Sequence, residues 1–309
     1  MKTGAAADPR IWTADAIDDA GCWYYPTPDV CISAIEVARE SPLPVTEIQL
    51  PESLRAACSQ ALRPVRDALE HGRGFAIVQP PRQELSRDDL VLLYWIVGFG
   101  LGRPFAQNVQ GTLLYDVRDT GQDLAKGARF SVTNYESSFH TDNSFGVEVL
   151  DYVGLLCLQT AKTGGRSQVL SGFALHHALR STEPEILEML CRPFHIDRRG
   201  GVHEGESPTI QFPIIREHDA ELLFRYLRYW IEAGHEKAGQ PLSPKQLKAL
   251  DVLDEYLRRS DLRVEFDLKP GQMFFINNRW ILHNRTAFED YPEIERRRHL
   301  VRLWLQAGN

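Results

Sequence analysis

The segment 137–145, SSFHTDNSF, places a histidine and an aspartate one residue apart. On an extended strand, residues two apart project from the same face, so His140 and Asp142 would point together while Thr141 points away. Such a pair could bind a metal ion or form a structural hydrogen bond. The tripeptide alone does not decide between these two roles. The chain has 10 histidines and 42 acidic residues, so some such pairs occur by chance, and a second His-x-Asp is present at 195–197.

A third ligand would have to come from a distant part of the chain. The best candidate is His283, in NNRWILHNRTAF, where an apolar strand ends and polar residues begin, as expected at the mouth of a cavity. Two histidines and one carboxylate form a facial triad that leaves positions open on one side of a ferrous ion, as in non-haem iron oxygenases. The same ligand set also suits a catalytic zinc ion.

These residues resemble the taurine dioxygenase (TauD/TfdA, clavaminate synthase-like) family of Fe(II)- and 2-oxoglutarate-dependent dioxygenases. The family pattern is His-x-Asp, a Ser or Thr about 25 residues on, a second His after a long insert, and an Arg about 11–15 residues past it. Here 24 residues separate Asp142 from Ser167, a further 115 separate Ser167 from His283, and arginines follow at 296–298. The pair at 195–197 lacks a hydroxyl residue in the corresponding window. The resemblance spans roughly residues 74–306.

The resemblance implies a role for each matching residue. His140, Asp142 and His283 would bind iron(II), while Ser167 and an arginine would hold the distal carboxylate of the cosubstrate 2-oxoglutarate. Strand alternation in the closing segment places Arg296, Arg298, Leu300, Arg302 and Trp304 on one face, and Arg297, His299, Val301 and Leu303 on the other. Arg298 is the preferred oxoglutarate ligand, with Arg296 as the alternative, and Arg302 is the substrate-side candidate.

The implied reaction is the oxidation, most simply the hydroxylation, of an unactivated C–H bond in a small polar metabolite. Dioxygen is consumed, and oxoglutarate is converted to succinate and CO2. Related halogenases carry a small residue where this chain has Asp142, so halogenation is not expected. Two alternatives are a zinc-dependent hydrolase, which leaves Ser167 and Arg298 unexplained, and a non-catalytic jelly-roll protein that binds small molecules.

The elements that must position these residues read as a mainly β fold with flanking helices, specifically a double-stranded β-helix or jelly roll. Residues 1–50 are expected to form an extended N-terminal arm packed on the domain. A single oxygenase domain would follow over 51–309, with a helical insert around 172–260. Short apolar runs predict strands at 74–79, 112–117, 129–135, 151–160, 167–171, 263–268, 272–278 and 299–306. Apolar residues at helical spacing predict helices at 52–69, from 86 to about 100, and after Ser243.

The composition and net charge of the chain limit the kinds of partner that it is expected to bind. The net charge is −7, from 35 basic and 42 acidic residues, and no long basic stripe is present, which argues against nucleic acid or an anionic membrane as partner. The apolar run 90–102 is too short to span a bilayer and predicts a buried helix. Five scattered cysteines and the absence of an export signal predict a cytoplasmic protein. A homo-oligomer is left open.

Overall fold

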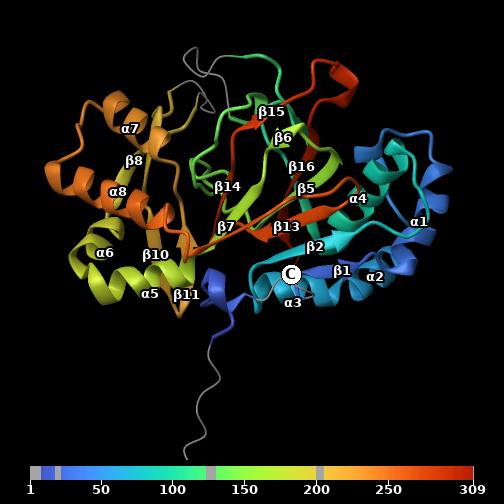
Figure 1. The fold of residues 1–309 in the computed structure, drawn as a ribbon, viewed down its shortest axis with the longest axis horizontal. Helices are drawn as coiled ribbons and strands as arrows, with labels where there is room; N and C mark the ends of the chain where they lie inside the picture. The colour runs from blue at the N-terminus through green and yellow to red at the C-terminus, as the bar shows by residue number, and fades with distance from the viewer. Residues whose placement is uncertain (1–7, 18–21, 123–129, 200–204, 309) are drawn as a thin grey trace, which may run out of the picture.

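A mixed sheet of seven strands runs through the centre of the molecule, in a computed structural model that describes residues 8–17, 22–122, 130–199 and 205–308 (Figure 1). The strand order is β1-β2-β13-β5-β16-β3, and β4 also pairs with β16. Only the β1–β2 pair is parallel among these pairs. The strands are β1 Tyr24–Pro26, β2 Phe75–Gln79, β3 Gly102–Phe105, β4 Leu114–Val117, β5 Tyr152–Gln159, β13 Met273–Asn277 and β16 His299–Ala307.

The two faces of this sheet belong to two different hydrophobic cores. In β13, Phe274 and Ile276 join one core, whereas Met273 and Phe275 join the other. This division follows from the two-residue period of a strand, and it explains why the central strands read as continuous apolar runs.

Helices of the N-terminal part cover one face of the sheet. They are α1 Asp29–Arg39, α2 Glu52–Ala61, α3 Arg63–Glu70 and α4 Arg87–Leu101. Ser86 caps α4 by accepting from the Asp89 N–H, and the helix is buried from Leu92 to Leu101 except at Phe99, as the apolar run predicts. The expected helix 52–69 is divided at Leu62, with Pro64 in the first turn of α3. Of the helices in the described residues, none has both the length and the apolarity to cross a bilayer.

The first fifty residues are more regular than the expected extended arm. Strand β1 extends the large sheet by pairing with β2, and α1 is an eleven-residue helix. The side chains of Cys31, Ala34, Ile35 and Ala38 join the same core as α2 and α4. A short helix in this Pro- and Asp-rich segment was not evident from apolar periodicity, because its buried side is made largely of small residues.

A second, three-stranded sheet of order β12-β7-β14 lies on the other side of the sheet, opposite the helices α1–α4. Its strands are β7 Ser167–Ser171, β12 Arg263–Phe266 and β14 Ile281–Arg285. A separate two-stranded antiparallel pair joins β6 Thr163–Gly164 to β15 Phe288–Glu289. In the β7–β14 register, His283 is opposite Val169 and Arg285 is opposite Ser167. Residues in these positions share one face, so Ser167 and His283 face the same way.

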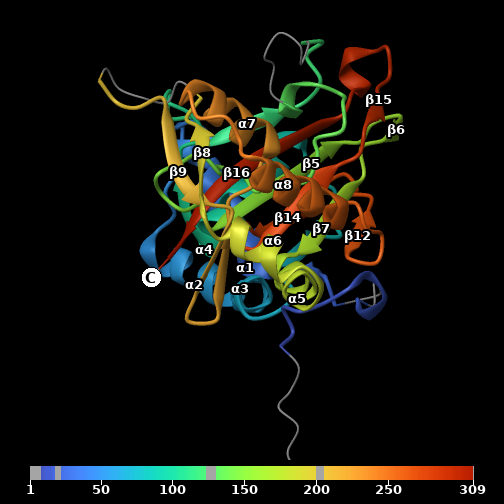
Figure 2. The ribbon, with the colours of Figure 1, turned by 90° about the vertical axis from the view of Figure 1, so that its left-hand side faces the viewer.

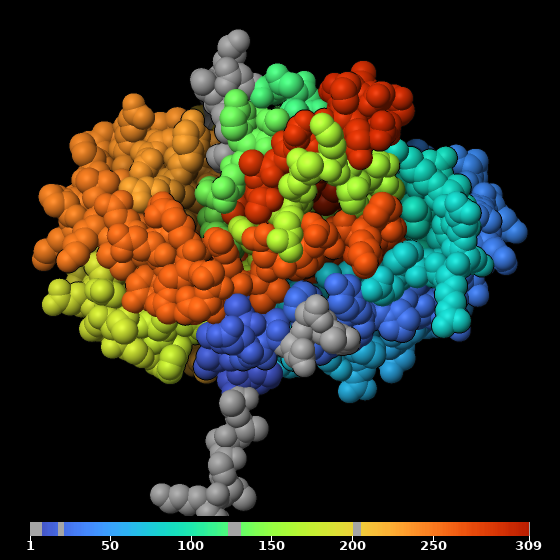
Figure 3. Space-filling view, in the orientation of Figure 1, coloured from blue at the N-terminus to red at the C-terminus, as the bar shows by residue number. Residues whose placement is uncertain are grey.

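The expected helical insert contains both helices and strands and packs beside the second sheet (Figure 2). Its hairpins β8–β9 and β10–β11 were not predicted from the sequence. Its elements are α5 Gly172–Thr182, α6 Pro184–Leu190, β8 Pro193–Asp197, β9 Thr209–Pro213, β10 Ile215–His218, β11 Glu221–Phe224, α7 Arg228–Lys237 and α8 Pro244–Leu257. The space-filling view shows the insert and the N-terminal helices on opposite sides of the central strands (Figure 3).

The strand predicted at 129–135 is wrong. Arg129 is outside the described residues, Phe130–Val132 form a 3-10 helix, and no strand follows. The carbonyl groups of Thr133 and Tyr135 instead accept hydrogen bonds from the Arg285 guanidinium. A half-buried side-chain donor therefore satisfies backbone groups that a neighbouring strand would otherwise satisfy.

Candidate metal centre

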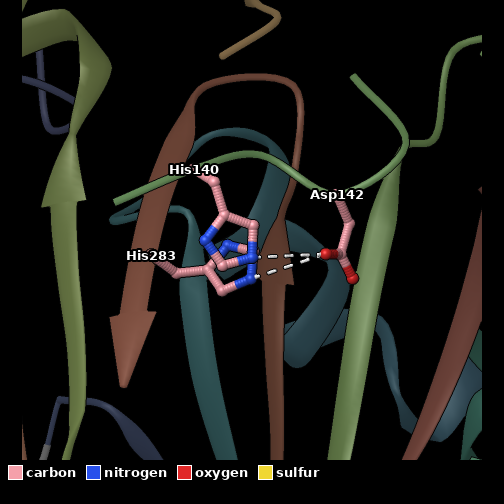
Figure 4. Close-up of side chains that lie close together, drawn as sticks. All are labelled: His140, Asp142 and His283. Carbon is pink, nitrogen blue, oxygen red and sulfur yellow. Dashed lines mark ion pairs between the residues drawn. The ribbon is translucent and has the colours of Figure 1, made fainter. Parts of the chain in front are cut away.

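A single antiparallel bridge brings His140 and His283 together. The His140 N–H donates to the His283 carbonyl and the His283 N–H donates to the His140 carbonyl, both at 3.0 Å. Residues paired in this way present their side chains on the same face, and the two ring centroids are 4.3 Å apart. Figure 4 shows the two imidazoles side by side, facing Asp142.

Asp142 completes a cluster whose donor atoms all lie within 4.8 Å of one another. Its Oδ1 atom is 3.5 Å from His140 Nε2 and 4.0 Å from His283 Nε2. Its Oδ2 atom accepts hydrogen bonds from Arg302 Nη1 at 3.1 Å and Trp304 Nε1 at 2.8 Å. One carboxylate oxygen is thus held by the protein, while the other faces the two histidines.

The backbone around Asp142 is held by side chains that the sequence did not single out. Asn278 accepts from the Asp142 N–H at 2.8 Å and donates to the Asp142 carbonyl at 3.0 Å. Thr141, between the two ligands, donates to the Phe224 carbonyl and accepts from the Tyr226 N–H, both at 3.1 Å. The segment that carries Asp142 is therefore a turn that follows the His140–His283 bridge and is held by side-chain hydrogen bonds. It is not the regular strand end that we expected.

The protonation states in the cluster fit a divalent metal. Burial raises the pKa of Asp142, but the Arg302 guanidinium and the two histidines outweigh it and hold this pKa well below its usual value. Burial and the neighbouring His140 lower the pKa of His283 to about 3, so its imidazole is neutral. His140 Nδ1 lies 2.9 Å from the Ser138 carbonyl and must donate to it, which leaves the lone pair on Nε2.

The triad opens into a cavity of about 490 Å³ that is lined by the large sheet, the second sheet and the insert. Ser167 is buried and lines it, as the resemblance implies. Four residues of the expected face of β16 and its approach also line the cavity, namely Arg298, Leu300, Arg302 and Trp304. On the other face, Val301 and Leu303 join the core beneath the helices. The predicted alternation is therefore confirmed from Arg298 to Trp304, although a register shift lies between His299 and Leu300. It is wrong for Arg296, because Ile294–Arg296 form a 3-10 helix before β16 and Arg296 does not line the cavity.

Among the arginines at 296–298, only Arg298 reaches the cavity. It is buried, and its Nη1 atom has no hydrogen-bond partner among the described residues. Burial lowers the pKa of Arg298 to about 10, so it remains charged at neutral pH. Arg296 is half exposed and pairs with Glu293 at 3.6 Å, while Arg297 donates to the Tyr291 carbonyl at 3.2 Å.

Arg302 lies against the metal-facing carboxylate. Besides its bond to Asp142, its Nε donates to Gln107 Oε1 at 2.7 Å, and Gln107 Nε2 donates back to the Arg302 carbonyl at 2.9 Å. Gln107 is buried and also donates to the Leu113 carbonyl. These contacts fix the guanidinium beside Asp142.

The competing pair His195 and Asp197 is in strand β8 of the insert and is not part of the cluster. His195 Nε2 contacts Gln211 Nε2 at 2.8 Å, and Asp197 forms an ion pair with Lys237 at 2.8 Å. His176 is buried beside Glu217. These side chains make contacts within the insert. For His195 and Asp197, this agrees with the sequence, where no hydroxyl residue follows the pair at the family spacing.

Sequence reasoning missed the wall that the insert contributes to the cavity. Arg199, Leu227, Tyr229 and Trp230 line it, together with Arg285 of β14. No local sequence pattern isolates these residues. Their position depends on how the insert folds back over the sheets.

Comparison with known proteins shows the family to which this chain belongs. Residues 38–304 match the model of the taurine catabolism dioxygenase TauD, TfdA family. FR-33289 synthase from Streptomyces rubellomurinus is 28% identical over 97% of this chain and 89% of that protein.

Solved structures of non-haem iron oxygenases share the fold. OrfP with Fe, succinate and (3S)-hydroxy-L-Arg superposes with a TM-score of 0.67 at 17% identity, over 92% of this chain and 94% of that one. Asparagine oxygenase with Fe(II), hydroxyasparagine and succinate gives a TM-score of 0.64 at 18% identity, over 92% and 93%. With the family match covering most of its length, this chain belongs to the TauD/TfdA family of Fe(II)- and 2-oxoglutarate-dependent dioxygenases.

Proposed function

We propose that His140, Asp142 and His283 bind one iron(II) ion and that the enzyme hydroxylates a C–H bond of a small polar metabolite. The observation that carries the proposal is the gathering of two imidazoles and one ionised carboxylate at the cavity wall. Bound iron supplies the reaction with dioxygen, and oxoglutarate, converted to succinate and CO2, supplies the electrons. The full carboxylate at Asp142 supports oxygenation over halogenation.

The protein's own contribution begins with the cosubstrate. We propose that Arg298 and Ser167 bind the distal carboxylate of oxoglutarate, because a guanidinium provides a two-pronged donor and a hydroxyl one further hydrogen bond. The unpartnered Nη1 atom of Arg298 supports this role. Gly165 supports it as well, since a Cβ atom there would be 3.1 Å from Arg298 Nε and would crowd the guanidinium.

The contacts of Arg302 favour a role other than the substrate contact that the resemblance implies. Together with Trp304, it holds Oδ2 of Asp142, so that Oδ1 is presented to the metal with its lone pairs available. We propose that these two residues orient the metal carboxylate. A direct contact between Arg302 and substrate stays a prediction.

The arrangement of the two sheets supports a more specific assignment of the fold. We propose that the large sheet and the three-stranded sheet are the two halves of a double-stranded β-helix, with residues 51–309 as one oxygenase domain and residues 1–50 packed on it. The triad lies between the two sheets in this arrangement, which supports the interpretation. Cytoplasmic location stays a prediction from the sequence.

Anaerobic addition of iron(II) and oxoglutarate tests the reaction class. The wild-type protein is expected to develop a weak visible charge-transfer band, and Asp142→Ala is expected to lose it, because the iron loses its only carboxylate ligand from the triad. Asp88→Ala, which removes an exposed carboxylate on α4, should behave like wild type. A band of full intensity in Asp142→Ala, or no band in the wild type, would exclude the proposed centre.

The arginine assignment is tested by titrating oxoglutarate into the anaerobic iron(II) protein and following the same band. Arg298→Gln is expected to weaken oxoglutarate binding about 100-fold, the value of two charge-assisted hydrogen bonds. Arg296→Gln is the matched control and should bind as wild type does, because its side chain faces solvent and Glu293. The reverse ranking of the two variants would assign oxoglutarate to Arg296.

The orientation of Asp142 is tested with Trp304→Phe, which removes one hydrogen bond to Oδ2 and keeps most of the apolar ring. Metal affinity, measured by anaerobic competition with a chelator, is expected to fall about tenfold, as for other changes next to a metal ligand. Trp95→Phe removes an indole donor from the other core, where Nε1 donates to the Ile48 carbonyl, and should leave the metal affinity unchanged. Equal affinities in both variants would argue against a positioning role for Trp304.

A further inference from the structure

We propose that Arg298 moves back into a second cavity when a longer 2-oxo acid binds, so that the enzyme accepts 2-oxoadipate as well as 2-oxoglutarate. This inference rests on the proposed function, because it takes Arg298 as the ligand of the distal carboxylate. It concerns the space that borders Arg298 outside the triad cavity, and hence the length of the cosubstrate that the site can hold.

Arg298 borders two cavities. Besides the triad cavity, it lines a second cavity of about 290 Å³, and Leu300 is also common to both linings. The second cavity lies where β6, β15 and the adjoining ends of β5 and β16 gather (Figure 1). The rest of its lining comes from residues 157, 160–165, 267 and 268. The side chain of Arg298 therefore forms part of the boundary between the two spaces.

The Nη1 end of the Arg298 guanidinium is held by packing, not by a hydrogen bond. Arg298 is 4% exposed, and its Nη1 atom has no hydrogen-bond partner among the described residues. Its hydrogen bond to Asp290, at 2.8 Å, comes from the backbone N–H. The guanidinium carbon lies 5.2 Å from the centroid of the Phe288 ring, a cation–π contact that tolerates sliding over the ring. The end of the side chain can therefore shift without breaking a hydrogen bond at Nη1.

Gly165 keeps room beside the Arg298 side chain. A Cβ atom at position 165 would lie 3.1 Å from Nε and 3.3 Å from Cδ of Arg298. Gly165 has a φ of 71°, a conformation that glycine adopts without strain, and it lines the second cavity. The turn at Gly165 thus leaves the guanidinium next to open space, where a residue with a side chain would crowd it.

The other charges of the second cavity are paired. Lys162 and Asp267 are the charged residues of its lining besides Arg298, and they have opposite signs. Lys162 pairs with Glu289 at 2.9 Å, and Asp267 pairs with Arg166 at 3.4 Å. No unpaired charge of the described lining therefore competes with the cosubstrate carboxylate for the guanidinium. The second cavity offers the side chain space and not a stronger partner.

The length of the diacid decides where the guanidinium lies. 2-Oxoadipate has one methylene group more than 2-oxoglutarate between its two acid ends. A rigid apolar pocket that fits one ligand discriminates against an extra methylene by about 10- to 200-fold. A buried guanidinium without its carboxylate is costly, so it follows the carboxylate when the chain is longer. Because the second cavity takes up this movement, the ion pair is kept and most of the discrimination is lost.

The experiment measures the binding of three 2-oxo acids to the anaerobic iron(II) protein by calorimetry. 2-Oxoadipate is expected to bind within about tenfold of 2-oxoglutarate, because the extra methylene is not forced into a closed pocket. 2-Oxohexanoate has the six-carbon chain without the distal carboxylate, and it should bind at least about tenfold more weakly than 2-oxoadipate. A loss of more than about tenfold with 2-oxoadipate, or a smaller difference between the two six-carbon acids, would overturn the proposal.

The role of the second cavity is tested with Ala161→Leu, which adds bulk at its lining. This variant is expected to bind 2-oxoglutarate within about threefold of wild type and 2-oxoadipate about tenfold more weakly, because the guanidinium has less room to move back. The control Ala56→Leu adds the same bulk at an exposed position of α2 and should bind both acids as wild type does. An Ala161→Leu protein that binds both acids as wild type does, or that loses both equally, would contradict the assignment.

The wild-type protein separates failure of this inference from failure of the oxygenase function. No charge-transfer band with iron(II) and 2-oxoglutarate would refute the oxygenase function itself. A band with 2-oxoglutarate, together with poor binding of 2-oxoadipate, would refute only the movement of Arg298.

Discussion

The bridge between His140 and His283 is the constraint on which the site depends. Two reciprocal hydrogen bonds join a turn that precedes β5 to a strand near the C-terminal end, and they place both imidazoles on one side. The turn that leads into β14 also carries Asn278, which holds the backbone of Asp142 from both its N–H and its carbonyl. The turn from β13 to β14 and strand β14 itself thus supply the second histidine and position the carboxylate. A change that shifts β14 would therefore disturb all three side chains together.

Strand β16 connects the site to the core of the protein. Its outer face packs Val301 and Leu303 against the N-terminal helices, and its inner face presents Arg302 and Trp304 to Asp142. Because a strand has only two faces, packing of the apolar face fixes where the polar face points. The stability of the helical layer and the geometry of the carboxylate are therefore coupled through one strand. The insert forms the opposite wall of the cavity, and its backbone at Phe224 and Tyr226 also holds Thr141 between two of the metal ligands.

A site residue can be predicted from the sequence when spacing or strand alternation along the chain marks it. It cannot be predicted when its role arises only where distant segments meet. His140, Asp142, His283, Ser167 and Arg298 were singled out because their spacing resembles a family pattern, and the structure places all five at one cavity. Asn278 and Thr141 were missed because their roles exist only where segments distant in sequence meet. The strand predicted at 129–135 failed because the Arg285 side chain takes the carbonyls that a neighbouring strand would bond. Arg199 carries no local signal, since its place in the cavity is set by the folding of the insert.

The central claim is that these three side chains hold one iron ion with Arg298 across the cavity from it. A crystal structure of the anaerobic complex with iron(II) and oxoglutarate, with iron located by its anomalous scattering, tests this most directly. The account predicts a single iron bonded to Nε2 of His140, Oδ1 of Asp142 and a ring nitrogen of His283, with the distal carboxylate of oxoglutarate on Arg298. Iron bound elsewhere, or oxoglutarate turned away from Arg298, would contradict it.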